Sequence, residues 1–264
     1  MFRLPKIPAT LLVLTTALVL SLVSTAARAE ELNADQIASR VVRGSGFTWE
    51  GAETRLRMIL IDKAGQKTER ALEVLGRRHE GRLETVARFM SPSDIAGTKF
   101  LMVEKASGGS EQHIYLPGLK RTRRVVGREQ EGSFMGSDFT YSDLQRKEDK
   151  SAKNAKLPDE KIGSEPTYVL ETTAGSGSDG SYSKLRMWIR KTDFIPLRTQ
   201  FFDASGNLKK TLYVRRTQEI EGKPTVVEAL MKSADGHQTE LVVDSVSQKK
   251  DFPDSTFSPL TLDR

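Results

Sequence analysis

The chain has 264 residues, 41 basic and 35 acidic side chains, a net charge of +6, and no cysteine. The missing cysteine excludes disulfides, thiol chemistry, cysteine-based metal sites and a lipobox, so the chain is not itself a lipoprotein. Stability must therefore come from an apolar core, which a chain of this length can build as one large domain.

The N-terminus has the pattern of a secretory signal. Two basic residues precede an apolar run at residues 7–27, and Ala27-Arg28-Ala29 has the small-x-small form that signal peptidase reads. We expect cleavage after Ala29, which leaves residues 30–264 as a single periplasmic domain with a milder net charge. The alternative is an uncleaved membrane anchor, since the apolar run approaches the length that spans a bilayer.

One helix is expected directly after this segment. Asn33 with Gln36 three residues later forms a capping-box pattern, and the predicted helix ends near residue 43, before Gly44-Ser45-Gly46.

Beyond the helix, the hydrophobic period changes to two. Short alternating segments occupy residues 54–126 and again residues 167–246, separated by turns that contain Gly or Asp. We expect about eleven strands in an antiparallel meander, which requires a strongly curved sheet or a barrel because a long flat sheet leaves costly edges. Residues 133–144 break the alternation and fit a helix or a loop, and residues 147–161 fit a charged surface connection.

Three motifs between residues 89 and 144 carry a family resemblance. They are Phe-Met-Ser-Pro-Ser-Asp-Ile-x-Gly-Thr from residue 89, Tyr-Leu-Pro followed by basic residues from residue 115, and Gly-Ser-Phe-Met-Gly-Ser-Asp-Phe from residue 132. Together they resemble the outer-membrane lipoprotein-sorting proteins, which are periplasmic relatives of the lipoprotein carriers LolA and LolB. The resemblance implies a mainly β fold in which one curved antiparallel sheet forms an open half-barrel closed by short helices.

A hydrophobic ligand cavity is the main candidate site. Strand alternation and the resemblance together suggest that its walls are Leu56, Met58, Leu60, Met90, Phe100, Met102, Phe134, Met135 and Phe139. Residues 134–139 combine apolar side chains with flanking glycines, as a lid over such a cavity would. The alternatives are ordinary core packing for the methionines, a loop packed on the core, or a short helix at 139–144 capped by Ser137 or Asp138.

A basic cluster is the second candidate. Its members are Lys120, Arg121, Arg123, Arg124 and Arg128. They fit either a solvated edge strand, where basic side chains deter aggregation, or a contact with anionic lipid head groups or an acidic partner. Nucleic acid is not an expected partner, because aromatic side chains are scarce here and the chain carries an export signal.

Catalytic and metal-binding patterns were not found in the sequence. His79, His113 and His237 are far apart, and no P-loop, nucleophile elbow or dinucleotide fingerprint occurs. We therefore expect that the protein is not an enzyme and binds no cofactor or metal. We expect instead a monomeric carrier of lipid or lipoprotein acyl chains. The alternative is an interaction or sensor module, an accessory of a resistance-nodulation-division-type membrane transporter. An envelope hydrolase is a weaker third option.

Overall fold

The computed structural model describes residues 31–44, 51–106, 108–145, 151–175, 182–248 and 251–264. The expected signal segment, residues 1–29, lies outside the described residues. Residues Leu32–Arg264 form one compact unit. No helix in the described part of the chain is long and apolar enough to span a membrane.

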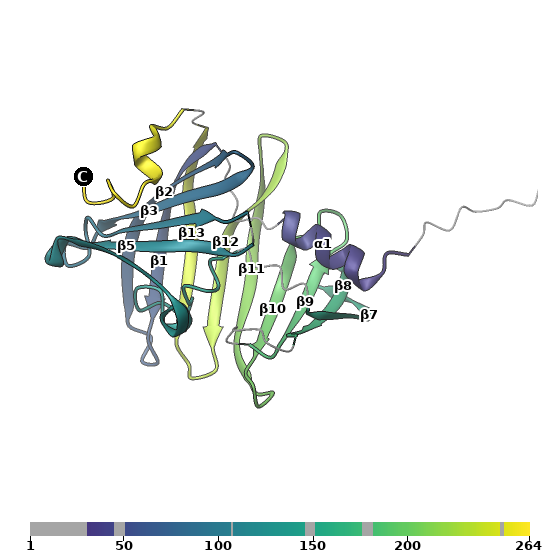
Figure 1. Ribbon diagram of the computed structural model, residues 1–264. Helices are drawn as coiled ribbons and strands as arrows, with labels where there is room; N and C mark the ends of the chain where they lie inside the picture. The colour runs from purple at the N-terminus through teal and green to yellow at the C-terminus, as the bar shows by residue number, and fades with distance from the viewer. Residues whose placement is uncertain (1–30, 45–50, 107, 146–150, 176–181, 249–250) are drawn as a thin grey trace, which may run out of the picture. The chain divides into compact units, whose positions relative to one another are not determined.

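The described residues form 13 strands in one antiparallel sheet (Figure 1). The strands are β1 (Ala52–Ile61), β2 (Lys67–His79), β3 (Arg82–Ser91), β4 (Lys99–Glu104), β5 (Ser110–Leu116), β6 (Arg121–Arg124), β7 (Lys153–Ile162), β8 (Glu165–Thr173), β9 (Lys184–Arg190), β10 (Pro196–Phe202), β11 (Leu208–Ile220), β12 (Lys223–Ser233) and β13 (Gln238–Gln248).

The order of the strands shows two meanders joined in the middle of the sheet. The first runs from β1 outward to the edge strand β6, and the second runs from the opposite edge strand β7 back to β13, which pairs with β1. The two edges are not paired with each other, so the sheet is open. The connection from β6 to β7 must therefore pass from one edge of the sheet to the other.

The expectation of about eleven strands was wrong, and residues 147–161 show one reason. Much of this segment belongs to β7, an edge strand that pairs only with β8. All its side chains are exposed or half-buried, so it lacks the apolar alternation of an inner strand. Pro158 lies where the register shifts, as is usual for proline in an edge strand.

The helix α1 (Ala34–Gly44) begins as the sequence predicts. The Asn33 backbone N–H donates to Gln36 Oε1 and the Gln36 N–H donates to Asn33 Oδ1, both at 2.9 Å, which is a complete capping box. Ile37 and Val41 pack against Leu170 of β8 and Ile189 of β9. The helix thus covers this end of the sheet (Figure 1).

Alternation on β4 separates the two faces of the sheet. Phe100 and Met102 lie in the largest buried cluster, on the face that we call the covered face. Leu101 points the other way and packs with the C-terminal residues Phe252 and Phe257, the latter in the 3₁₀ helix η3 (Asp254–Phe257).

The helix α1 also lies on the covered face. Met187 of β9 packs against the cluster that contains Ile37 and Val41 of α1, and it is paired with Thr199 of β10. Phe201 lies two residues further along β10, so it is on the same face as Thr199, and it packs against the largest cluster. The expectation that short helices close this face was wrong for the largest cluster, because an irregular loop covers it.

The capping box yields a stability prediction. Asn33→Ala removes the side-chain acceptor and should destabilise α1 by about 1 kcal/mol. We expect faster hydrogen exchange of the α1 amides, while Asn33→Ser, which keeps an acceptor, should exchange nearly as the unmodified protein does. Equal protection in Asn33→Ala would show that packing of Ile37 and Val41 alone holds the helix.

Candidate functional site

The predicted cavity residues gather at one place, with one exception. Leu56, Met58, Phe100, Met102, Phe134 and Phe139 are buried together on the covered face, and Leu60 and Met135 are half-buried against them. Met90 does not belong to this cluster, because its neighbour Phe89 faces the cluster and Met90 is 58% exposed. Alternation along β3 made Phe89 the better choice, and the sequence analysis missed it.

The cluster is covered by residues 132–144, which we call the covering loop. This loop is part of the connection between the two edges of the sheet. The Phe134 ring lies 5.1 Å from that of Phe100, 5.9 Å from that of Phe89 and 5.4 Å from that of Tyr141. Its aromatic side chains therefore fill the apolar face of the sheet.

The backbone of the covering loop bonds mainly to itself. The Phe134 N–H donates to the Phe139 carbonyl at 2.7 Å, and Ser133 forms an isolated bridge with Thr140. Met135 and Gly136 turn the chain with φ values of 52° and 76°, in the left-handed region. The short helix considered for 139–144 is not formed, because Thr140 and Asp143 bond to each other across a single turn.

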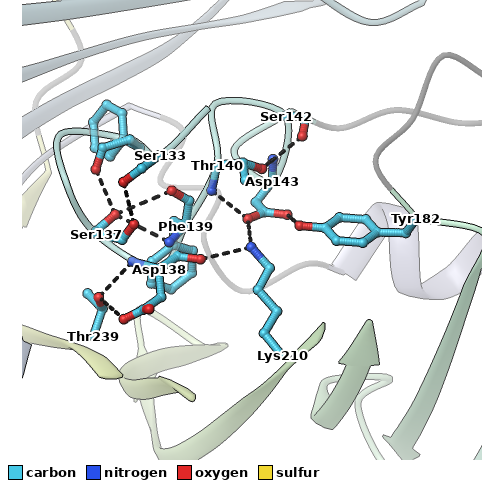
Figure 2. Close-up of polar contacts among 11 residues, drawn as sticks. Ser133, Ser137, Asp138, Phe139, Thr140, Ser142, Asp143, Tyr182, Lys210 and Thr239 are labelled. Carbon is cyan, nitrogen blue, oxygen red and sulfur yellow. Dashed lines mark hydrogen bonds and ion pairs between the residues drawn. The ribbon is translucent and has the colours of Figure 1, made fainter. Parts of the chain in front are cut away.

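One attachment of the loop to the sheet is a buried ion pair. Lys210 of β11 donates from Nζ to Asp143 Oδ2 and, at 2.8 Å, to the Asp138 carbonyl (Figure 2). The Tyr182 hydroxyl donates to Asp143 Oδ1 at 3.0 Å. The side chains of Lys210 and Asp143 are each only 5% exposed.

Three further attachments hold the loop along its length. The Asp138 N–H donates to Thr239 Oγ1 at 2.9 Å, and the Thr239 hydroxyl donates to Asp138 Oδ2 at 2.7 Å (Figure 2). Gln112 Nε2 donates to the Tyr141 carbonyl at 2.7 Å, and Arg70 donates to the Met135 carbonyl. In the described residues, these attachments all use a side chain of the sheet, so the loop could leave without breaking a strand pair.

Burial shifts the pKa values of these polar groups. Desolvation lowers the pKa of Lys210, although Asp143 opposes the change. Desolvation also raises the pKa of the Asp138 carboxyl, against the opposing hydrogen bond from Thr239, and raises the pKa of the Tyr182 hydroxyl. In each case the apolar surroundings disfavour the charged form.

The sequence analysis missed these polar residues, although one signal was present. Lys210 has the same strand parity as Leu212, which packs against the cluster. A lysine at an inward position of a strand is a signal of a buried partner. The partner, Asp143, lies 67 residues away and could not be found from local pattern.

The basic residues lie at the edge of the sheet, on and around β6. Arg121, Arg124, Lys120 and Arg128 are exposed, whereas Arg123 is half-buried and pairs with Glu129. Two apolar side chains flank them, Leu119 at 69% and Val126 at 53% exposure. The edge therefore presents both positive charge and apolar surface.

No metal centre is formed by the described residues, where no group of three or more His, Asp or Glu side chains could hold an ion. The residues predicted to line a ligand cavity form a closed apolar cluster beneath the covering loop.

The described residues form an open antiparallel sheet with an apolar face under a helix and a loop, and this fold is shared with a solved LolA superfamily structure. A family model described as "Uncharacterized protein" matches residues 81–264, and the chain belongs to that family. None of the curated proteins matches the chain.

Solved structures confirm the resemblance to outer-membrane lipoprotein-sorting proteins. An outer membrane lipoprotein-sorting protein domain from Vibrio parahaemolyticus is 28% identical with a TM-score of 0.79, over 88% of this chain and 98% of that one. A DUF1329 family protein from Desulfovibrio piger is 22% identical with a TM-score of 0.79, over 88% and 100%. A LolA superfamily protein from Nitrosomonas europaea is 20% identical with a TM-score of 0.66, over 86% and 98%.

Burial of Asp138 predicts an unusual pH dependence. Because the pKa of Asp138 is raised above its ordinary 3.8, the folded protein retains a proton that the unfolded chain loses just above that pH. Its contribution to stability is thus present at low pH and is lost as the pH rises through the folded pKa. Asp138→Asn should raise the free energy of unfolding at pH 7 and remove this component from urea denaturation measured against pH.

Asp254→Asn is the matched control with the opposite sign. Arg77 lowers the pKa of the Asp254 carboxyl below 3.8, so its contribution is present above that pH and is lost on acidification. Asp254→Asn should therefore lower stability at pH 7. A loss of stability at pH 7 in Asp138→Asn as well would mean that the Thr239 contact, not desolvation, dominates at Asp138.

Proposed function

We propose that the protein is a non-enzymatic periplasmic carrier that binds acyl chains of a lipid or lipoprotein on the covered face. The observation that carries the proposal is the covering loop, which buries a large apolar surface yet is attached to the sheet through side chains. The likeness to lipoprotein-sorting and LolA superfamily structures supports the same class of protein.

The free energy gained by burying an acyl chain is comparable to the cost of exposing the apolar side chains of the covering loop. Opening the loop exposes the side chains of Phe134, Phe139 and Tyr141, which are buried in the cluster, at a cost of roughly 1.5–3 kcal/mol each. An acyl chain recovers about 0.8 kcal/mol for each CH₂ that it buries, so roughly six to eleven methylenes offset the three rings. An ordinary lipid chain could therefore replace the loop on the covered face.

A covalent lock tests whether ligand enters beneath the loop. Asp138 and Thr239 are in direct hydrogen-bond contact, and the chain has no cysteine of its own, so Asp138→Cys combined with Thr239→Cys gives one defined pair. The oxidised variant should not take up a fluorescent fatty acid, and reduction should restore uptake. Its Tm should also rise, because the bond closes a loop of about 100 residues in the unfolded chain.

Each single-cysteine variant serves as a control for the loss of the Asp138–Thr239 contact, and mass spectrometry verifies the bond. Undiminished uptake by the fully oxidised protein would place the ligand elsewhere and refute the proposed route.

A second candidate function, docking of the module to a membrane or to a transporter partner, is favoured by the basic edge around β6. Exposed Leu119 and Val126 beside Arg121 and Arg124 combine an apolar anchor with positive charge. Such a surface suits an anionic bilayer, where each basic residue contributes about 1 kcal/mol. Docking and carriage are compatible, since the edge and the covered face are different surfaces.

Reversal of charge at this edge tests docking. Replacing Arg121, Arg123 and Arg124 with Glu should abolish binding to phosphatidylglycerol vesicles, and binding by the unmodified protein should weaken as salt rises. The Tm should change little, because exposed ion pairs such as Arg124–Glu111 contribute about 0–1 kcal/mol each. Glu at the exposed Lys63, Lys223 and Lys232 changes the charge equally and should leave binding largely intact. An equal loss of vesicle binding in both variants would mean that binding depends on the overall charge of the protein and not on this edge.

A further inference from the structure

Lys210 depends on the covering loop for its hydrogen-bond acceptors. The carboxylate of Asp143 and the carbonyl of Asp138 accept its hydrogen bonds, and both residues belong to the loop (Figure 2). From the sheet side it meets the rings of Phe201, with the centroid at 5.5 Å, and Tyr182, at 5.4 Å. The neighbouring charge on its own strand is another cation, Lys209.

Opening of the loop therefore removes both acceptors at once. Lys210 would then face the same apolar surface as Leu212 and Met231, which pack in the cluster. A ligand that covers this surface also excludes water from the ammonium group. An unpaired cation under an apolar ligand is strongly disfavoured, so a neutral ligand is a poor substitute for the loop.

The Tyr182 hydroxyl supplies a second donor at the same point. In the closed structure Asp143 receives Lys210 on one carboxylate oxygen and Tyr182 on the other. Tyr182 precedes β9 and does not belong to the loop, so this donor would stay with the sheet. Together the two groups form a site for two oxygens of one anion.

We propose that Lys210 and Tyr182 bind the anionic head group of the ligand, whose oxyanion takes the place of the Asp143 carboxylate when the covering loop opens. This inference rests on the proposed carrier function and narrows its ligand to an amphiphile with a carboxylate or phosphate head. Asp143 acts in the closed state as an internal substitute for that head group.

Matched ten-carbon ligands test the selection, with calorimetry on the full protein. Decanoate, decyl phosphate and decanol share the same tail and differ in the head. A charge-assisted hydrogen bond is worth about 1.5–3 kcal/mol, so at least one anion should bind about tenfold or more tightly than decanol. The two anions separate the sources, since a fatty-acid site prefers decanoate and a phospholipid site prefers decyl phosphate.

Substitutions at the site then assign the preference to its residues. Lys210→Met combined with Asp143→Leu replaces the ion pair by apolar side chains, and it should bind decanol about as tightly as the anions. Tyr182→Phe removes one donor without altering the ion pair and should weaken anion binding severalfold while leaving decanol unchanged. Lys209→Met removes an equal charge from an exposed neighbour and should keep the preference of the unmodified protein.

The outcomes separate this inference from the carrier function. Equal affinity of the unmodified protein for all three ligands overturns head-group selection but leaves the carrier function standing. An anion preference that survives in both Tyr182→Phe and the double variant also overturns it. Binding of none of the three overturns the carrier function and the inference together.

Discussion

The rest of the structure depends on one topological constraint, which is that the first and the last strand of the chain pair in the middle of the sheet. β1 and β13 pair at the centre, so the two meanders grow outward and leave β6 and β7 at opposite edges. The connection between these edges has to cross a face of the sheet. A chain that crosses an apolar face must bury apolar side chains, and Phe134, Phe139 and Tyr141 do so.

Polar contacts within this apolar region position the cover without strengthening the sheet. A buried ion pair gains little net stability, because desolvation offsets most of the attraction, but it strongly disfavours any arrangement that separates the charges. Lys210 with Asp143 and Thr239 with Asp138 thus fix where the loop lies on the sheet. The loop forms its own internal backbone bonds, and its attachments to the sheet named above are not strand pairs.

Local chemistry made much of the fold predictable from the sequence, and distant contacts did not. The capping box at Asn33 and the alternation of Phe100 and Met102 are local, and the structure confirms both. β7 was missed because an edge strand needs only backbone pairing and leaves no apolar period. Met90 was misplaced by one residue, which in a strand reverses the face. The ion pair of Lys210 could not be predicted, because its partner lies in a segment without periodicity.

The two edges of the sheet show how an open sheet of this size avoids pairing with another copy. β6 has only four residues and carries three arginines, and β7 carries Pro158 where its register shifts. Short length, charge and proline are the usual devices that block further strand addition. The arginines of β6 therefore have a structural reason to be present even if no partner binds them. The two exposed apolar side chains beside them, Leu119 and Val126, have no such reason, since apolar surface at an edge favours association. The docking proposed for this edge therefore rests on the apolar pair more than on the charge.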